Sequence, residues 1–406
     1  MKFKRIAKSL WHVFLFCAEH VVFLCPPGKV REVKELLVIK PDKLGDFVVW
    51  LDSAREYVEC FDDSRRVLVA EAHWSELAEI TDFWDEVIPV DVGQFREHLF
   101  YRLKILLRIR RRQTSIVINA SVRRTFRVSD VFARFSGASE KIGMTGAETR
   151  EGVAWIQRWS DRWYSQLVAA DNEVTYGEMG KQLSLTRVFG GGQRKAALPR
   201  MPLPATIPVP ERCPDGKYMV IVLGAAGTDR WWPVTSFVEI ARRFLDGSDY
   251  SIVLCGARAE RELSSSFLAL LDSARRTRTV DLIGATNVVE LVGVLRDAVA
   301  VLSNDTGAMH LAVALGRPTV CVAGVGDFGH LVPYPAELEI TGLPAPVTVY
   351  EKLPCYGCGW KCIHEVVDGA PVPCVSAVSV EAVWRNLIAL LKQEHGMGSG
   401  HGWRFQ

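Results

Sequence analysis

Residues 36–60 read LLVIKPDKLGDFVVWLDSAREYVEC, and this stretch decides the expected fold. Leu36–Lys40 is a short apolar run with β-branched residues, which is typical of a buried strand. A turn containing Pro41 and Gly45 follows, and Asp46–Cys60 has the pattern of a helix. A strand, a tight turn and a helix in this order begin a βαβ unit, so we expect a parallel sheet covered by helices.

The same alternation continues along the chain on both sides of one break. Before the break, further strands are predicted at 67–70, 87–90 and 115–119, and helices at 74–80, 94–112 and 124–136. After the break, strands are predicted at 218–223, 252–255, 280–283, 299–302 and 319–322. Helices are predicted there at 233–244, 259–272, 287–297, 307–315 and 379–393. Two α/β domains, each with a parallel sheet, are therefore expected.

The break has the composition of a linker. Gly190, Gly191 and Gly192 lead into six prolines between residues 199 and 214. We therefore divide the chain into an N-terminal basic helix (1–30), a Rossmann-like domain (31–195), a Pro-rich linker (196–215) and a second Rossmann-like domain (216–406). Ligands of such sheets bind beyond the carboxyl ends of the strands, and a cleft between the two domains is the expected site.

Composition excludes several classes of protein. With 49% hydrophobic and 24% charged residues, the chain of 406 residues is neither collagen-like nor disordered. Ten cysteines are too few for a disulfide-rich secreted module, and a net charge of +2 gives no reason to expect nucleic acid. Residues 96–127, however, carry ten Lys and Arg against the single acid Glu97. This excess predicts attraction to phosphates or to an anionic membrane.

The first 30 residues combine basic and apolar residues. Their apolar stretch is interrupted by Glu19 and His20 and is shorter than the ~20 residues of a membrane span. Several polar residues fall in one sector about 100° wide on a helix, although apolar residues fall there too. These polar residues are Lys4, Arg5, Lys8, His12 and Glu19. We expect an amphipathic helix that rests either on a membrane surface or on its own domain.

Two motifs lie where a predicted strand gives way to a helix. Residues 40–46 (KPDKLGD) bring Asp46 to the start of a helix, where it could accept a proton from a substrate hydroxyl or could only cap the helix. Residues 224–233 (GAAGTDRWWP) offer backbone N–H groups to an anion, and Arg230 could neutralise a leaving phosphate or could be a solvated loop residue.

A third motif, SNDTGAMHL at residues 303–311, follows the predicted strand 299–302. Thr306 and Gly307 would present N–H groups and a hydroxyl to phosphate oxygens at a helix start. Asp305 could hold a substrate hydroxyl or orient a neighbouring group. His310 alone is more typical of a buried, hydrogen-bonded histidine than of a catalyst.

In this order and spacing, the motifs resemble those of glycosyltransferase family 9, the ADP-heptose:lipopolysaccharide heptosyltransferases. The matching residues are Ile39, Lys40, Leu44, Gly45 and Asp46, then Arg230 before Trp231-Trp232-Pro233, and finally Asp305, Thr306, Gly307, His310 and Leu311. Leu282-Ile-Gly-Ala-Thr286 also resembles a segment that lies near the donor base in that family. The resemblance covers residues 35–395.

The resemblance implies an α/β GT-B fold and an inverting transfer that uses neither a metal ion nor another cofactor. Asp46 would be the general base and Arg230 would stabilise the departing diphosphate. The donor would contact Gly227, Glu260, Thr286, Asp305, Thr306, Gly307 and His310, and the acceptor would contact Lys40, Arg123 and Arg124. Domain 31–195 would take the acceptor and domain 216–406 the nucleotide-sugar.

The implied partners are a nucleotide-sugar, ADP-heptose first, and an anionic glycan or glycolipid such as the lipopolysaccharide core. The implied location is cytoplasmic, peripheral at the inner face of the bacterial inner membrane. Two other functions stay open at this point. One is a nucleotide-sugar epimerase or hydrolase, and the other is a GT-B scaffold without catalytic activity.

The cysteines at 355, 358, 362 and 374 form the cluster least like the rest of the chain. Four thiols at this short spacing could hold zinc, or they could be the reduced thiols of an ordinary loop.

Overall fold

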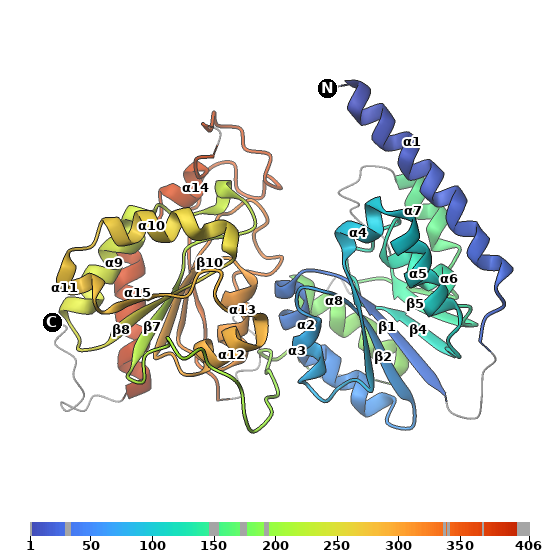
Figure 1. Cartoon of the computed structure of the whole chain (residues 1–406), viewed down its shortest axis with the longest axis horizontal. Helices are drawn as coiled ribbons and strands as arrows, with labels where there is room; N and C mark the ends of the chain where they lie inside the picture. Colours follow the sequence, from blue (N-terminus) through green and yellow to red (C-terminus); the bar gives the residue numbers. More distant parts are fainter. Residues whose placement is uncertain are drawn as a thin grey trace. The chain divides into compact units, whose positions relative to one another are not determined.

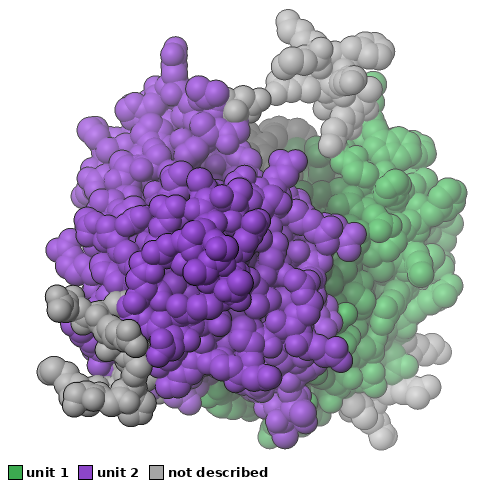
Figure 2. Space-filling model, turned by 60° about the vertical axis from the view of Figure 1, so that its left-hand side comes forward, with its two compact units in different colours: residues 1–43, 53–194 green, residues 44–52, 195–406 purple. Residues whose placement is uncertain are grey.

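The computed structural model describes residues 2–28, 34–145, 154–170, 177–190, 195–335, 338, 342–367 and 369–395. The chain divides into two compact units (Figure 2). Residues 1–43 and 53–194 form unit 1, and residues 44–52 and 195–406 form unit 2. Helix α2 (Leu44–Cys60) therefore begins in unit 2 and ends in unit 1.

Unit 1 is built on a six-stranded parallel sheet in the order β3-β2-β1-β4-β5-β6. This order is that of a doubly wound Rossmann sheet, whose ligand crevice lies where the strand order reverses, here between β1 and β4. The strands are β1 (Glu35–Lys40), β2 (Arg65–Glu71), β3 (Glu86–Val90), β4 (Ile116–Asn119), β5 (Glu140–Met144) and β6 (Gln166–Val168).

Helices cover this sheet (Figure 1). They are α3 (Ser75–Glu79), α4 (Val92–Glu97), α5 (Leu99–Arg110), α6 (Ser129–Phe135), α7 (Ala154–Asp161) and α8 (Gly177–Thr186). Every residue of β1 is buried, which explains its continuous apolar run. The rings of Phe95 of α4 and Phe132 of α6 are in tilted contact, with centroids 4.6 Å apart, in a core that includes Leu37 and Ile39.

Unit 2 repeats the same sheet order, β12-β11-β10-β7-β8-β9, again with all strands parallel. The order reverses between β7 and β10, so the expected ligand crevice lies beyond these two strands. The strands are β7 (Tyr218–Val222), β8 (Ser251–Cys255), β9 (Thr279–Asp281), β10 (Ala300–Asn304), β11 (Thr319–Val322) and β12 (Val347–Val349).

The helices of unit 2 lie on both faces of its sheet (Figure 1). They are α9 (Val234–Asp246), α10 (Arg261–Ala269), α11 (Ser273–Arg276), α12 (Val288–Arg296), α13 (Gly307–Ala314), α14 (Pro373–Ser376) and α15 (Val380–His395). Phe237 and Phe244 of α9 share one core with Val383 and Leu387 of α15. Asn287 is the N-cap residue of α12 and forms a capping box. Its side chain accepts the backbone N–H of Glu290, and the Glu290 carboxylate accepts the backbone N–H of Asn287, both at 2.8 Å.

The predicted basic helix 94–112 is wrong as a single helix. The structure forms α4 and α5 instead, separated at His98, whose extended backbone (φ −115°, ψ 112°) interrupts the helix. Among the described residues, three strands (β5, β6 and β12) and four helices (α7, α8, α11 and α14) were not predicted from the sequence.

The N-terminal helix α1 (Lys2–Glu19) lies alongside α5 (Figure 1). Glu19 is fully buried, and its carboxylate accepts from Arg102 Nε at 2.6 Å. His12 contacts Arg127 at 2.8 Å. Part of the polar sector therefore packs against unit 1 rather than water. No helix among the described residues is long and apolar enough to cross a membrane.

Carboxylates and carbonyls within unit 1 engage many cations of the basic stretch. Arg112 pairs with Glu35 and with Glu86, and Arg108 also pairs with Glu86. Arg110 donates to the carbonyl of Cys25 at 3.1 Å. The predicted basic patch is therefore partly neutralised within unit 1. Those that remain exposed on α5 and just after it are Lys104, Arg108 and Arg111.

Candidate active site

The loops that leave β7 and β10 are joined by Asn304, the last residue of β10. Its Nδ2 donates to the carbonyl of Leu223 at 2.7 Å, and its Oδ1 accepts the N–H of Trp232 at 3.0 Å. Asn304 is fully buried, so these bonds hold the Gly224–Pro233 loop against the start of the next motif. The sequence motif included Asn304 but gave no reason to single it out.

Glu260 occupies space left by two glycines at the carboxyl ends of β7 and β8. A Cβ on Gly224 would lie 2.0 Å from Glu260 Oε1, and one on Gly256 would lie 2.1 Å from Oε2. The N–H of Ala257 donates to Oε2 at 3.0 Å. Burial raises the pKa of the Glu260 carboxyl, and the Ala257 hydrogen bond only partly offsets this. A polar acceptor is thus built into the crevice where a nucleotide ribose is expected.

Thr306 begins α13. Its Oγ1 accepts the N–H of Met309 at 3.3 Å and lies 3.1 Å from Ser303 Oγ, so this hydroxyl caps the helix. Gly307 is the first residue of α13, where backbone N–H groups and the helix dipole favour an anion.

His310 is buried on α13 beside Asp305. Its Nδ1 lies 2.8 Å from the hydroxyl of Tyr334, and its Nε2 lies 3.5 Å from Asp305 Oδ1. Burial holds the pKa of Tyr334 well above its usual value, so this phenol stays neutral and its hydroxyl orients the imidazole. His310 is thus buried and hydrogen-bonded, and its Nε2 faces Asp305, whereas its contact with a donor stays a prediction. Tyr334 was not predicted.

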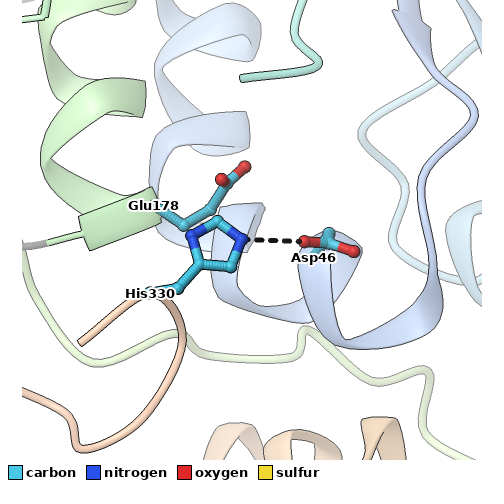
Figure 3. A group of neighbouring side chains, drawn as sticks. All are labelled: Asp46, Glu178 and His330. Carbon is cyan, nitrogen blue, oxygen red and sulfur yellow. Dashed lines mark ion pairs between the residues drawn. The ribbon is translucent and has the colours of Figure 1, made fainter. Parts of the chain in front are cut away.

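Asp46 lies on the first turn of α2, where Lys43 is the N-cap residue. Figure 3 shows the imidazole of His330 directed at the Asp46 carboxylate, with Nε2 4.0 Å from Oδ1. The Asp46 side chain is 22% exposed and the His330 side chain 14%, so both are reachable from solvent yet partly desolvated. His330 follows β11 in the loop GDFGH at residues 326–330 and was not predicted.

The start of α2 packs directly on α13 within unit 2. A Cβ on Gly307 would lie 2.7 Å from Leu44 Cγ, and a Cβ on Gly45 would lie 3.0 Å from His310 Cδ2. These approaches bring the Asp46 turn next to the predicted phosphate-binding turn.

Arg230 ends a short 3₁₀ turn (Thr228–Arg230) for which Gly227 is the N-cap residue. Its guanidinium lies 3.9 Å from the ring centroid of Trp360, a cation–π contact that fixes the guanidinium plane. Trp360 was not predicted. Thr286 is half-buried in the loop between β9 and α12, one residue before the cap of α12.

The predicted acceptor residues of unit 1 have internal partners. Lys40 is fully buried, and its Nζ contacts Glu178 Oε1 at 3.2 Å and Asp42 Oδ2 at 3.1 Å. Arg124 is buried and pairs with Asp130 at 3.2 Å. Both charges hold the ends of β1 and β4 in place. Arg123 is half-buried beside them in sequence.

Comparison with known proteins supplies the family. Residues 102–353 match the model for glycosyltransferase family 9 (heptosyltransferase). The chain belongs to glycosyltransferase family 9. It is 23% identical over 335 residues to Lipopolysaccharide heptosyltransferase 2 of Escherichia coli strain K12, a match that covers 79% of this chain and 90% of the relative. Lipopolysaccharide heptosyltransferase 1 of Pseudomonas aeruginosa is 24% identical over 303 residues, covering 71% and 78%.

Solved structures agree with the fold. E. coli ADP-heptose lps heptosyltransferase II aligns with a TM-score of 0.64 at 20% identity, over 89% of this chain and 100% of that one. E. coli heptosyltransferase WaaC with ADP aligns with a TM-score of 0.66 at 18% identity, over 88% and 99%. The predicted GT-B fold and family are confirmed, and the family-9 chain is a glycosyltransferase.

Proposed function

We propose that this glycosyltransferase moves heptose from ADP-heptose to a sugar hydroxyl of the lipopolysaccharide core, with inversion at the anomeric carbon. Two observations outside the site support the choice of donor and acceptor. The relatives described above are named lipopolysaccharide heptosyltransferases, and one solved family structure was determined with ADP. Within this chain, the observation that carries the proposal is the packing of the Asp46 turn on α13.

In the proposed reaction, Asp46 takes the proton from the acceptor hydroxyl. The resulting oxygen attacks the anomeric carbon of heptose from the face opposite the diphosphate. The carbon–oxygen bond to the diphosphate breaks, and ADP leaves with the electron pair. His330, 4.0 Å from Asp46, orients the carboxylate. No covalent sugar intermediate is needed, and one displacement inverts the configuration.

The negative charge that develops on the departing ADP requires fixed positive groups. Arg230 supplies a full charge whose orientation Trp360 restricts, and the start of α13 at Gly307 supplies N–H groups and a partial charge. In a partly desolvated site such preorganised groups stabilise the transition state more than mobile ones would.

The remaining donor contacts follow from position. Glu260 would accept from the ribose hydroxyls, Thr286 would lie near the adenine, and Asp305 would hold heptose hydroxyls. Gly227, Thr306 and His310 complete the donor set, and residues 216–406 are the nucleotide-sugar domain. Residues 31–195 are the acceptor domain, in which Lys40 and Arg124 position strand ends and Arg123 remains the candidate for acceptor phosphate.

Asp46→Asn tests the proposal. Transfer from ADP-heptose to heptose-deficient core lipopolysaccharide should fall by about 10²- to 10⁴-fold, the usual contribution of a general base. ADP affinity, measured by calorimetry, and the melting temperature should not change. Asp62→Asn, at an exposed aspartate just after α2, is the matched control. Full transfer by Asp46→Asn would remove Asp46 as the base. If the wild-type enzyme transferred sugar from another nucleotide-sugar and not from ADP-heptose, the assignment of ADP-heptose as the donor would be wrong.

We also infer that the enzyme works at the cytoplasmic face of the inner membrane, held there peripherally by α1 and α5. One stripe of α1 and the following 3₁₀ turn is apolar and exposed, with residues recurring at helical spacing. The stripe comprises Leu10, Val13, Phe14, Val21 and Leu24. On α5, Phe100 is 86% exposed and shares a helix face with Lys104 and Arg108. Apolar side chains flanked by cations suit an anionic bilayer.

Flotation with vesicles tests the membrane contact. The full chain should bind vesicles containing phosphatidylglycerol and should bind neutral phosphatidylcholine vesicles more weakly. Replacing Leu10, Phe14 and Leu24 together by Ser should abolish binding without loss of ADP affinity. Leu270→Ser, at an exposed leucine of unit 2, is the control. Unchanged flotation of the triple variant would refute the contact.

A further inference from the structure

We call residues 355–374 the cysteine loop. The structure places its four cysteines around one hollow, which their spacing in the sequence did not establish. All ten cysteines of the chain are free of disulfide bonds in the structure. Four of them line one small hollow of about 10 Å³, together with the imidazole-bearing His364. The four are Cys355, Cys358, Cys362 and Cys374.

Apolar side chains and one imidazole also line the hollow. Its other lining groups include Val325, Leu353 and Val372, so the thiols meet inside an apolar shell. His364 Nε2 lies 3.8 Å from Cys355 Sγ.

The backbone of the cysteine loop is irregular. Between β12 and α14, the described residues form no helix or strand. Four of its described residues have positive φ: Gly357 (75°), Gly359 (62°), Trp360 (63°) and Gly369 (84°). A non-glycine residue in this region costs free energy unless its surroundings hold it there.

Hydrogen bonds and packing contacts tie the loop to residues 324–326, just after β11. The N–H of Gly357 donates to Val325, and the N–H of Gly359 donates to Gly326 at 2.7 Å. The ring of Trp360 lies so close to Gly326 that a Cβ there would be 2.8 Å from a ring atom. A cross-link among the thiols would therefore also fix Trp360 beneath Arg230.

We propose that the four cysteines of the cysteine loop bind one structural metal ion of the thiolate-preferring class, zinc or iron, in tetrahedral coordination. Cys-x₂-Cys with two further thiols is a ligand set typical of such sites, and hard cations such as Mg²⁺ prefer oxygen donors. The site has no open position and takes no part in the transfer step. Its role is to hold the loop that carries Trp360.

Metal analysis of the purified full chain, without a histidine tag, tests the site. About one zinc or iron per chain is expected, and which of the two is present identifies the ion. Cys358→Ser and Cys374→Ser should each lose most of the metal, whereas Cys60→Ser, a half-buried cysteine outside the loop, should retain it. Equal metal content in all three variants would overturn the assignment.

A second measurement needs no variant. A mercurial thiol reagent added to the native wild-type protein should release the metal to a colorimetric chelator in step with modification of the loop thiols. If the protein as purified holds no metal and takes up neither Zn²⁺ nor Fe²⁺ when fully reduced, the site does not exist. Disulfides among the four thiols in a metal-free protein would overturn it equally.

Discussion

Replacing Glu260 separates a binding role from a structural one. Among the described residues, the backbone N–H of Ala257 donates to Oε2 of this carboxylate. Oε1 faces the position of a Gly224 side chain and is free to accept from a ribose hydroxyl. A hydrogen bond to a charged group contributes about 1.5–3 kcal/mol. Glu260→Ala should therefore weaken ADP binding by about 10- to 150-fold, because each 1.4 kcal/mol is tenfold in Kd.

Glu260→Gln should have a smaller effect, about 5- to 15-fold, because the amide still accepts a neutral hydrogen bond. The pH dependence gives a second signature. Because burial raises the pKa of Glu260, wild-type affinity should fall as the pH is lowered through a value above the usual 4.5, where the carboxylate becomes protonated. The Gln variant has nothing to protonate at this position.

Calorimetric titration with ADP between about pH 5 and pH 8 measures both the loss of affinity and its pH dependence. Dividing the wild-type affinity by that of Glu260→Gln at each pH cancels the titration of ADP itself. Glu262→Gln, an exposed glutamate two residues along, is the control. If Glu260→Gln binds ADP as tightly as wild type at every pH, Glu260 only caps its helical turn.

Three further expectations concern other parts of the molecule. Trp360→Leu should lower kcat/KM by about 5- to 30-fold through loss of about 1–2 kcal/mol of cation–π restraint on Arg230, and Trp360→Phe should recover part of it. Burial opposes ionisation of Glu86, but hydrogen bonds from arginines outweigh this and hold its pKa at about 2. The Glu86 carboxylate therefore contributes fully to stability above its unfolded pKa near 4.5, and this contribution is lost as the pH falls toward 2. The free energy of unfolding of Glu86→Gln should accordingly depend less on pH across that window than that of wild type. Glu19→Leu leaves Arg102 buried without its partner, so protease cleavage after α1 should become faster, whereas activity on soluble acceptors should persist.

The sequence predicted the central strands well because both faces of each sheet are covered. Such strands appear as continuous apolar runs, and β1, β7 and β11 were predicted to within a residue of their ends. The missed strand β5 reads EKIGM, so its polar start and Gly143 hide the pattern. The strands β6 and β12 are three residues long, too short for periodicity to reveal them.

Site residues were predictable where a local motif carried them and unpredictable where the partner came from far along the chain. Lys40 was expected to face an acceptor, yet its partner Glu178 lies 138 residues away in a helix that had not been predicted. His330 and Trp360 belong to loops without periodicity. The one local signal for His330 was its place in a glycine-containing loop after a predicted strand, where parallel sheets collect functional groups.

The two most specific motifs explain each other through their glycines. The sequence left Gly45 as an ordinary turn residue and Gly307 as a phosphate-binding one. In the structure, a Cβ at Gly307 would lie within 2.7 Å of Leu44, and a Cβ at Gly45 would lie 3.0 Å from His310. Both glycines are therefore needed for the same close approach of α2 to α13. The Leu-Gly-Asp and Asp-Thr-Gly-x-x-His motifs, 259 residues apart between Asp46 and Asp305, are two sides of one packing contact, and that contact positions the proposed base.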